Sequence, residues 1–287
     1  MNIKSIALGL IPDKIYLQLL YKHRMGKRLD LKNPKSFNEK LQWLKLYDRR
    51  PEYITMVDKY EAKNYVAKII GEEYIIPTLG MWDSFDEVDF DSLPEQFVLK
   101  CTHDSGGLVI VKDKSKFDRA AARKKINDSL AVDYYKLGRE WPYKNVKRKI
   151  IAENYLVDES GYELKDYKVF NFGGDPKIIQ VDFDRFTSHK RNLYSTDWDL
   201  IDVDIHYPSD KSREINKPEA LEKMLEIAKM LSNGYPYIRT DFYCINKRIY
   251  FGEITLYPGC GTEEFNPDDW DLKLGEWIKL PNPNKGL

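Results

Sequence analysis

The spacing of hydrophobic residues divides the chain into a helical first part and a strand-rich remainder. Over the first 70 residues, apolar side chains recur every three or four positions, as on one face of a helix. Helices are predicted over residues 14–29, 37–47 and 58–70. Ser36 and Glu39 form a capping-box pattern at the start of the second helix, and Gly71 caps the end of the third. The N-terminal segment is therefore expected to be helical.

From Gln96 onward the pattern becomes that of β-strands. Short apolar or alternating runs separated by Gly, Pro, Asn and Asp predict strands. They are expected at residues 97–101, 108–111, 149–156, 165–172, 178–183, 238–245 and 249–255. A further short strand is expected at 74–77, a helical turn at 83–90 and a polar loop at 185–195. Two long helices, over 118–133 and 218–231, interrupt this region, so the pattern indicates an α+β fold rather than alternating βαβ units.

The last two predicted strands form a hairpin around the turn Asn246–Arg248. Side chains two positions apart share a face, which pairs Arg239 with Asp241 on one strand and Glu253 with Thr255 on the other. If the faces coincide, Asp241 and Glu253 lie opposite each other, and facing carboxylates favour a cation between them. Oxygen ligands beside an arginine suit Mg²⁺ with a phosphorylated substrate. A solvated face with charges of both signs is the alternative.

Composition limits the classes of protein that fit. The 287 residues suit two lobes, and 42% hydrophobic residues with 13% aromatics can fill a sizeable core. The 46 basic and 46 acidic residues cancel, which argues against a general nucleic-acid binder. Cys101, Cys244 and Cys260 have no CxxC spacing, so neither a zinc site nor a disulfide framework is expected. A reducing, cytoplasmic location is predicted.

Any contact with a membrane is predicted to be at the bilayer surface, without a segment that spans the bilayer. No apolar run approaches the roughly 20 residues that span a bilayer. Residues 14–29 nevertheless place apolar side chains among basic ones: Ile15, Leu19, Leu20 and Met25 among Lys14, Lys22, Arg24, Lys27 and Arg28. Such a helix either packs against the protein or lies on a membrane or partner surface. Both interpretations stay open.

A lysine and a glycine-rich loop follow each other at residues 97–107. The strand places Lys100 among apolar residues, and the loop offers the hydroxyl of Ser105 and the pair Gly106–Gly107. Backbone amides and one lysine commonly hold phosphate oxygens, and glycine allows close approach to a ligand. The lysine precedes the glycines and a strand follows them, so this is not a Walker loop. A plain hairpin turn is the alternative.

Three further polar groups are candidate ligand contacts. The apolar strand that carries Glu153 can present backbone groups to an adenine ring and a carboxylate to its amino group or ribose. Asp166 and Lys168 share one face of a strand, as in a surface ion pair or a contact to ribose or phosphate. The loop at 185–195 suits either an anionic ligand or solvent. Its polar residues are Arg185, Ser188, His189, Lys190 and Arg191.

The order of these pieces is more specific than any one of them. A strand with lysine, a glycine-rich loop, a strand, a helix, a strand with glutamate and an acidic hairpin follow one another over roughly residues 55–262. This order resembles the ATP-grasp superfamily, and in particular its teichuronopeptide-biosynthesis (TupA-like) branch. The stretches that carry the resemblance are Ser36-Phe-Asn-Glu-Lys-Leu-Gln-Trp, Asp58-Lys-Tyr, Phe97-Val-Leu-Lys-Cys-Thr-His-Asp-Ser-Gly-Gly, Phe251-Gly-Glu-Ile-Thr and Tyr257-Pro-Gly-Cys-Gly.

The resemblance implies a fold with two α+β lobes that clamp ATP and a helical N-terminal extension. The implied division is a helical extension over 1–55, an N-terminal lobe over 56–95, a lid lobe over 96–157 and a C-terminal lobe with the metal site over 158–287. The N-terminal helices lack an evident βαβ unit, so the acceptor side is expected to differ from that of better-known ligases.

The resemblance also implies residue roles, with ATP and Mg²⁺ as cofactors. Lys100 would bind the α- and β-phosphates, Ser105, Gly106 and Gly107 would close over them, and Glu153 with the backbone near Leu156 would meet adenine. Asp158 or Asp166 would face the ribose, with Lys168 nearby as a nucleotide contact. Asp241 and Glu253 would hold Mg²⁺, and Arg239 would steady the transferred phosphoryl group. Thr255 stands where many members have asparagine, and its hydroxyl is a weaker metal ligand.

The implied activity is ATP-dependent ligation of a carboxylate to an amine through an acyl phosphate. Because the TupA-like branch is associated with bacterial surface polysaccharides, the expected carboxylate is a uronic acid and the expected amine an amino acid, at the cytoplasmic face of a membrane-bound assembly. A nucleotide-sugar glycosyltransferase is the alternative, since Asp182-Phe-Asp184 and Asp202-Val-Asp204 supply two Asp-x-Asp segments. A non-catalytic ATP-binding scaffold is a third possibility.

Overall fold

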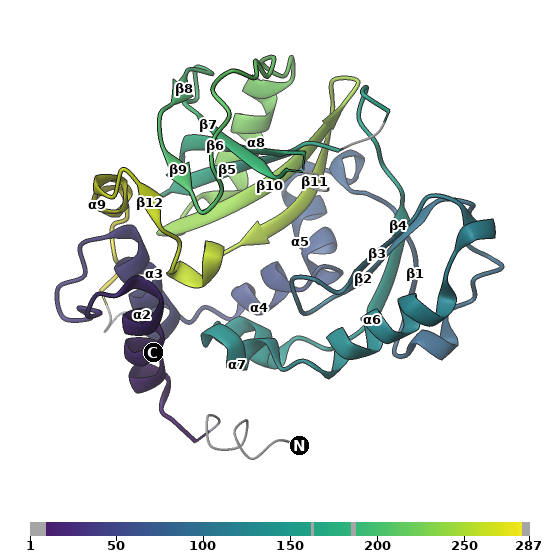
Figure 1. Cartoon of the computed structure of the whole chain (residues 1–287), viewed down its shortest axis with the longest axis horizontal. Coiled ribbons are helices and arrows are strands. Elements are labelled where there is room, and N and C mark those ends of the chain that lie inside the picture. Colours follow the sequence, from purple (N-terminus) through teal and green to yellow (C-terminus); the bar gives the residue numbers. More distant parts are fainter. Residues whose placement is uncertain (1–9, 162–163, 185–187, 283–287) are drawn as a thin grey trace.

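The computed structural model describes residues 10–161, 164–184 and 188–282 and contains two large β-sheets (Figure 1). The four-stranded sheet has the order β1-β4-β2-β3 and the six-stranded sheet the order β11-β10-β5-β6-β7-β8, and every pairing in both is antiparallel. Helices lie along both sheets. This arrangement confirms the α+β class predicted from the sequence.

From residue 10 to residue 70 the structure describes four helices: α2 (Asp13–Met25), α3 (Phe37–Tyr47), α4 (Glu52–Val57) and α5 (Glu61–Ile70). The predicted capping box at the start of α3 is confirmed, because the Ser36 side chain accepts from the Glu39 amide while Glu39 accepts from the Ser36 amide. The first helix ends earlier than predicted because Gly26 takes the left-handed conformation, with a φ of 65°. The third predicted helix, over residues 58–70, corresponds to α5 and begins later than predicted, at Glu61.

The smaller sheet contains β1 (Thr78–Trp82), β2 (Phe97–Cys101), β3 (Leu108–Val111) and β4 (Ile150–Asn154), with α6 (Arg119–Ala131) packed on β2 and β3. Its own apolar core includes Phe97, Leu99, Ile126 and Ile150. The predicted strand at 74–77 is wrong: a 3-10 turn occupies Glu72–Tyr74, and the strand begins at Thr78. Pro77 has no amide hydrogen to give to a sheet, which favours a later start.

The larger sheet contains β5 (Asp166–Phe172), β6 (Asp175–Phe183), β7 (Lys190–Tyr194), β8 (Leu200–Ile201), β10 (Tyr237–Ile245) and β11 (Arg248–Thr255). Helix α8 (Leu221–Ser232) packs on β5, β6 and β10. The prediction of a polar loop over 185–195 is wrong for residues 190–194, which form β7 and include the buried Asn192 and Leu193. The strand was missed because its buried Arg191 and Asn192 hide the apolar alternation. Arg185 lies outside the described residues.

Several short elements were not predicted. Besides α4 and β8, they include α7 (Tyr134–Gly138), a 3-10 segment at Trp141–Asn145, β9 (Asp204–Ile205), β12 (Phe265–Asn266) and α9 (Asp269–Trp277). Strand β12 pairs with β9, and α9 packs against α3. Two-residue strands carry no periodicity, so sequence patterns could not reveal them.

The N-terminal helices share one hydrophobic core with the larger sheet. Leu17, Leu41 and Val66 belong to the same buried cluster as Val169, Phe242 and Leu274. The helical segment is therefore integrated with the larger sheet, and the four-part division proposed from the sequence stays a prediction. Within the described ranges, no helix is both long and apolar enough to cross a bilayer.

Candidate functional site

A cleft of about 660 Å³ lies between the two sheets. Its walls include Lys100 of β2 and Glu153 of β4 on one side, and Asp166, Lys168 and Asp241 of β5 and β10 on the other. The segments around α7 and around residues 257–263 complete the lining. Residues that the sequence scatters over more than 150 positions therefore face one space.

The predicted C-terminal hairpin is confirmed, and its acids lie opposite each other. Asp241 pairs with Glu253 and Arg239 with Thr255 across β10 and β11. The turn is shorter than predicted: Asn246 and Lys247 alone connect the strands, both with positive φ. The register shifts directly after Asp241, and this bulge resets the alternation so that both acids line the cleft.

The cation between the two acids in this structure is the guanidinium of Arg239. Its Nε and Nη2 donate to the two oxygens of Asp241 at 2.7 and 2.8 Å, and Nη2 also lies 3.4 Å from Glu253 and 3.0 Å from the Thr255 hydroxyl. Lys168 Nζ contacts Asp241 at 2.6 Å from the neighbouring strand. Burial opposes ionisation of Asp241, but Arg239 and Lys168 lower its pKa below the ordinary value. Asp241 is therefore an anion held by two cations.

The hairpin carries two carboxylates of the kind that could hold Mg²⁺ together with other ligands. Within the described residues, no group of three or more His, Cys, Asp or Glu side chains could hold a metal ion by itself. Mg²⁺ commonly takes only one or two carboxylates and completes its shell with phosphates and water. Asp241 and Glu253 fit that pattern, and the Glu253 side chain is 43% exposed toward the cleft. The donor set thus suits an ion that arrives together with a nucleotide.

Lys100 and Glu153 form an ion pair across β2 and β4. Lys100 Nζ lies 2.5 Å from one oxygen of Glu153, and Lys63 Nζ of α5 lies 2.5 Å from the other. Burial opposes both charges, but Glu153 raises the pKa of Lys100 and the two lysines lower the pKa of Glu153. At Lys63 burial prevails and lowers the pKa. Both carboxylate oxygens of Glu153 are thus paired with lysine ammonium groups.

The glycine-rich loop is built by local contacts. Gly106 has a φ of +137°, a conformation that suits only glycine. Asp104 accepts a hydrogen bond from the Gly107 amide and another from Ser129, while Ser105 and Gly106 are exposed at the cleft. His103 is buried and contacts the Val132 carbonyl, so it is not in the cleft lining. The loop is anchored at its base and open at its tip.

The remaining predicted nucleotide contacts separate into two groups. Asp166 and Lys168 line the cleft, 3.4 Å apart. Asp158 instead accepts from Lys165 Nζ at 2.7 Å, and neither Asp158 nor Leu156 is in the cleft lining. Of the two acids predicted for the ribose, the structure brings only Asp166 to the cleft.

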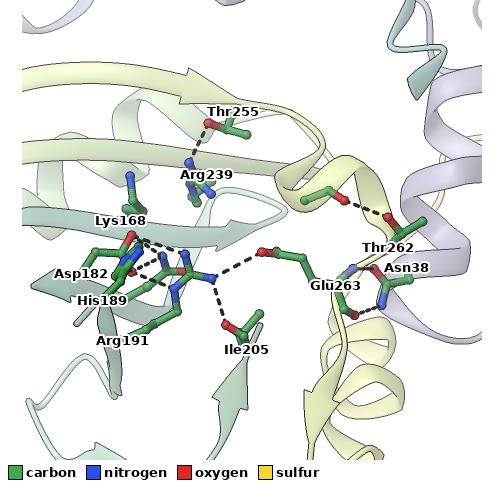
Figure 2. Close-up of polar contacts among 12 residues, drawn as sticks. Asn38, Lys168, Asp182, His189, Arg191, Ile205, Arg239, Thr255, Thr262 and Glu263 are labelled. Atoms are coloured by element: carbon green, nitrogen blue, oxygen red, sulfur yellow. Dashed lines mark hydrogen bonds and ion pairs between the residues drawn. The ribbon is translucent and has the colours of Figure 1, made fainter. Parts of the chain in front are cut away.

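A second charged group lies on the same cleft (Figure 2). Arg191 of β7 contacts Asp182 through Nε at 2.7 Å, the Ile205 carbonyl at 3.0 Å and Glu263 at 3.3 Å. The His189 ring stacks on Tyr207 with centroids 3.8 Å apart. His189 and Arg191 were singled out in the sequence as an anionic-ligand loop, and the structure places both at the cleft.

Other cleft residues carried no sequence signal. Glu140, Tyr143 and Glu263 line the cleft, and Lys63 lies behind its wall at Glu153. Lys63 and Glu263 contact residues that are far away in the chain. Lys63 follows the apolar stripe of α5 but points to Glu153, 90 positions later. Only the spatial arrangement of the sheets identifies such residues.

Comparison with protein families decides the assignment. The sequence model of the TupA-like ATPgrasp family matches residues 39–279. The chain belongs to the TupA-like ATP-grasp family. This membership confirms the predicted ATP-grasp fold and identifies the chain as an ATP-grasp enzyme. No curated protein sequence matches the chain.

Solved structures give more distant likenesses. D-alanine–D-alanine ligase from Helicobacter pylori has 16% identity and a TM-score of 0.48, over 87% of this chain and 69% of that one. The D-alanine–D-alanine ligase from Bacillus anthracis, solved with ATP, has 15% identity and a TM-score of 0.40, over 70% of this chain and 54% of that one. N5-carboxyaminoimidazole synthase from Aspergillus clavatus has 13% identity and a TM-score of 0.40, over 70% and 44%. The chain spans about half the length of the latter two, so the family match carries the assignment.

Proposed function

We propose that this ATP-grasp enzyme is an ADP-forming ligase that joins a carboxylate to an amine through an acyl phosphate. The observation that carries the proposal is a single cleft with cations from both sheets, Lys100 on one and Lys168 and Arg239 on the other, beside Asp241 and Glu253. Phosphoryl transfer depends mainly on positioning and on cations that stabilise the transferred group. The cleft supplies both.

Each cleft residue has a proposed part. Lys100 binds the nucleotide phosphates, and Arg239 steadies the transferred phosphoryl group. Mg²⁺, held by Asp241 and Glu253, supplies neutralisation of the phosphate charge when bound. Glu153 was first assigned to adenine, but its contacts to Lys63 and Lys100 favour a different part. We assign it to fixing Lys100 toward the phosphates.

The reaction then has two steps. A carboxylate oxygen of the substrate attacks the γ-phosphorus of ATP and ADP leaves, which gives an acyl phosphate. The nitrogen of an amine next attacks the acyl carbon and phosphate leaves, which gives an amide. A cleft with walls from both sheets and a glycine-rich loop at its rim can exclude water and protect the acyl phosphate from hydrolysis.

We assign the substrates to surface polysaccharide biosynthesis, with a uronic acid as the carboxylate and an amino acid or amine as the second substrate. The family name and the tyrosine-rich cleft support this choice. Tyr134, Tyr143 and Tyr207 line the cleft, and aromatic rings commonly pack on sugar rings while their hydroxyls bind polar groups. A glycosyltransferase is less well supported. Of the two Asp-x-Asp segments only Asp182 lines the cleft, where Arg191 holds it, whereas Asp184 pairs with Arg213 and Asp202 with Lys211 away from the cleft lining.

The N-terminal helices provide a surface that can meet a polysaccharide assembly at the membrane. Helix α2 buries Leu17 and Tyr21, whereas Leu10, Ile15 and Leu19 are 81%, 50% and 57% exposed. Residues 13–35 carry seven Lys or Arg and two Asp in a chain of zero net charge. An apolar strip within a basic surface suits the headgroups of anionic lipids. We therefore place the enzyme at the cytoplasmic face of the membrane.

The decisive experiment measures ADP release from Mg·ATP over a panel of uronic acids, each with and without amino acids. The proposal predicts ADP release that requires both substrates and an amide product in equal amount. Thermal shifts separate the alternatives: Mg·ATP should raise the melting temperature and UDP-sugars should not. Stabilisation by UDP-sugars, with none by Mg·ATP, would favour the glycosyltransferase. Stabilisation by Mg·ATP without turnover on any pair would favour the scaffold.

A further inference from the structure

Glu140 is a buried carboxylate of the cleft that the proposed phosphoryl transfer does not use. It lies between α7 and the segment Trp141–Asn145, lines the cleft and is only 8% exposed. Among the described residues, no Lys, Arg or His side chain forms an ion pair with it. Lys45 and Arg24 are the basic residues that act on Glu140 electrostatically, and both do so without an ion pair.

The other acids of the cleft walls have direct polar donors. Two lysines hold Glu153, Arg239 and Lys168 hold Asp241, and Arg191 contacts both Asp182 and Glu263. A buried carboxylate without such a cation is costly, and burial raises the pKa of Glu140 above its ordinary value. A cationic ligand group at this position would remove that cost.

Lys45 does not form an ion pair with Glu140, because its buried ammonium group donates hydrogen bonds to backbone carbonyls instead. Its ammonium donates to the Gly138 carbonyl at 2.9 Å and to the Cys260 carbonyl at 2.8 Å. Gly138 lies two residues before Glu140, and Cys260 belongs to the turn at Pro258–Gly261. The ammonium thus fixes the backbone around Glu140 and leaves the carboxylate facing the cleft.

Glu140 also lies near the proposed phosphoryl site. Tyr134 and Tyr143 contact each other edge to face, with ring centroids 4.7 Å apart. Both hydroxyls lie within electrostatic range of Glu140 and of Glu253, and Tyr143 is also within range of Arg239. The two rings therefore connect the buried carboxylate to the hairpin, as expected for neighbouring substrate subsites.

We propose that Glu140 forms the amine subsite, where its carboxylate binds the ammonium group of the second substrate and accepts one of its protons. This inference rests on the proposed ligase function. Loss of that proton frees the nitrogen lone pair, which forms the bond to the acyl carbon while the carbon–oxygen bond to phosphate breaks. The departing phosphate keeps the electron pair of that bond and takes the second proton from the nitrogen. The ligand class is a primary ammonium compound, such as an amino acid or an amino sugar.

The test compares wild-type chain with Glu140→Gln, using Mg·ATP and the uronic acid of highest activity. Hydroxylamine traps the acyl phosphate as a hydroxamate and is uncharged at neutral pH, so it needs no base. We expect hydroxamate formation to change less than about twofold, and amide formation with the amino acid to fall by about 100-fold, with a raised KM for the amino acid. Asp58→Asn is the matched control, because burial also raises the pKa of Asp58 but Asp58 lies outside the cleft lining.

Three results would overturn the inference. Unchanged amide formation by Glu140→Gln excludes the subsite while leaving the ligase function intact. An equal loss of hydroxamate and amide indicates a merely structural role. A wild-type chain that forms neither ADP nor hydroxamate with any uronic acid overturns the ligase function and this inference together. If Glu140→Gln does not fold, Glu140→Asp keeps the charge on a shorter side chain, and it should raise the KM for the amino acid while preserving the hydroxamate rate.

Discussion

At the scale of single residues, the two acids of the hairpin differ in their burial and in their ion-pair contacts. Asp241 is 1% exposed and neutralises both Arg239 and Lys168, whereas the Glu253 side chain is 43% exposed and makes one longer contact to Arg239. Removing one partner of a buried ion pair costs about 3–5 kcal/mol, but a half-exposed pair contributes about 1 kcal/mol or less. Removal of the Asp241 charge should therefore affect both stability and activity, whereas removal of the Glu253 charge should affect activity alone.

Glu253→Gln is expected to lower ATP turnover by about 100-fold, because it removes a carboxylate that we propose to bind Mg²⁺ while the fold remains. Asp241→Asn is expected to lower both turnover and thermal stability. ADP release and melting temperature measured on both variants check this prediction. Glu222→Gln, an exposed glutamate of α8, serves as the control. Normal turnover in Glu253→Gln would contradict the metal assignment.

At the scale of elements, α3 fixes one wall of the cleft through a line of buried polar side chains. Asn38 donates to the Glu263 carbonyl at 2.8 Å, Gln42 to the Cys260 and Gly261 carbonyls at 2.9 and 2.7 Å, and Lys45 to the Cys260 carbonyl. All three side chains are fully buried. Helical spacing places them on one face, so α3 holds the turn at residues 257–263 in place.

Helix α3 offers a matched pair of variants that separates this role from stability. Lys45→Met removes the ammonium from the cleft wall, and Lys40→Met removes one that donates to the Gly275 and Ile278 carbonyls near α9. Each variant removes the two hydrogen bonds that its lysine ammonium donates to backbone carbonyls, so both should lose about 1–3 kcal/mol of unfolding free energy. Only Lys45→Met should also raise the KM for the amine, by several-fold. Equal kinetics in the two variants would refute a positioning role for Lys45.

At the scale of the whole molecule, charge is distributed unevenly although the net charge is zero. The basic surface of residues 13–35 carries exposed Ile15 and Leu19, whereas α9 carries exposed Leu272 beside Asp269 and Asp271. Each Lys or Arg near an anionic surface contributes about 1 kcal/mol of attraction. The basic surface should therefore bind anionic lipid, and the acidic face of α9 should not.

Cosedimentation with phosphatidylserine-containing and phosphatidylcholine-only vesicles tests this expectation. Binding should require the anionic lipid, weaken as salt increases, and fall several-fold in Ile15→Glu. Leu272→Glu, an equally exposed leucine in an acidic setting, should bind like the wild type. Equal binding to both kinds of vesicle, or unchanged binding of Ile15→Glu, would count against a membrane role for α2.

Elements whose signals are local could be predicted from the order of amino acids. The capping box of α3, the hairpin at 238–255 and the shared faces of Arg239 with Asp241 and of Glu253 with Thr255 follow from spacing, because periodicity and turn residues act between near neighbours in the chain. The opposition of Asp241 and Glu253 depends in addition on the bulge after Asp241. Only the tertiary structure decided which polar side chains share the cleft. Glu153 meets Lys63, Lys45 spans two distant segments, and Arg191 lies on a strand that its own polarity concealed. Those contacts join residues tens to hundreds of positions apart, and a partner across the fold leaves no trace in the local pattern of either residue.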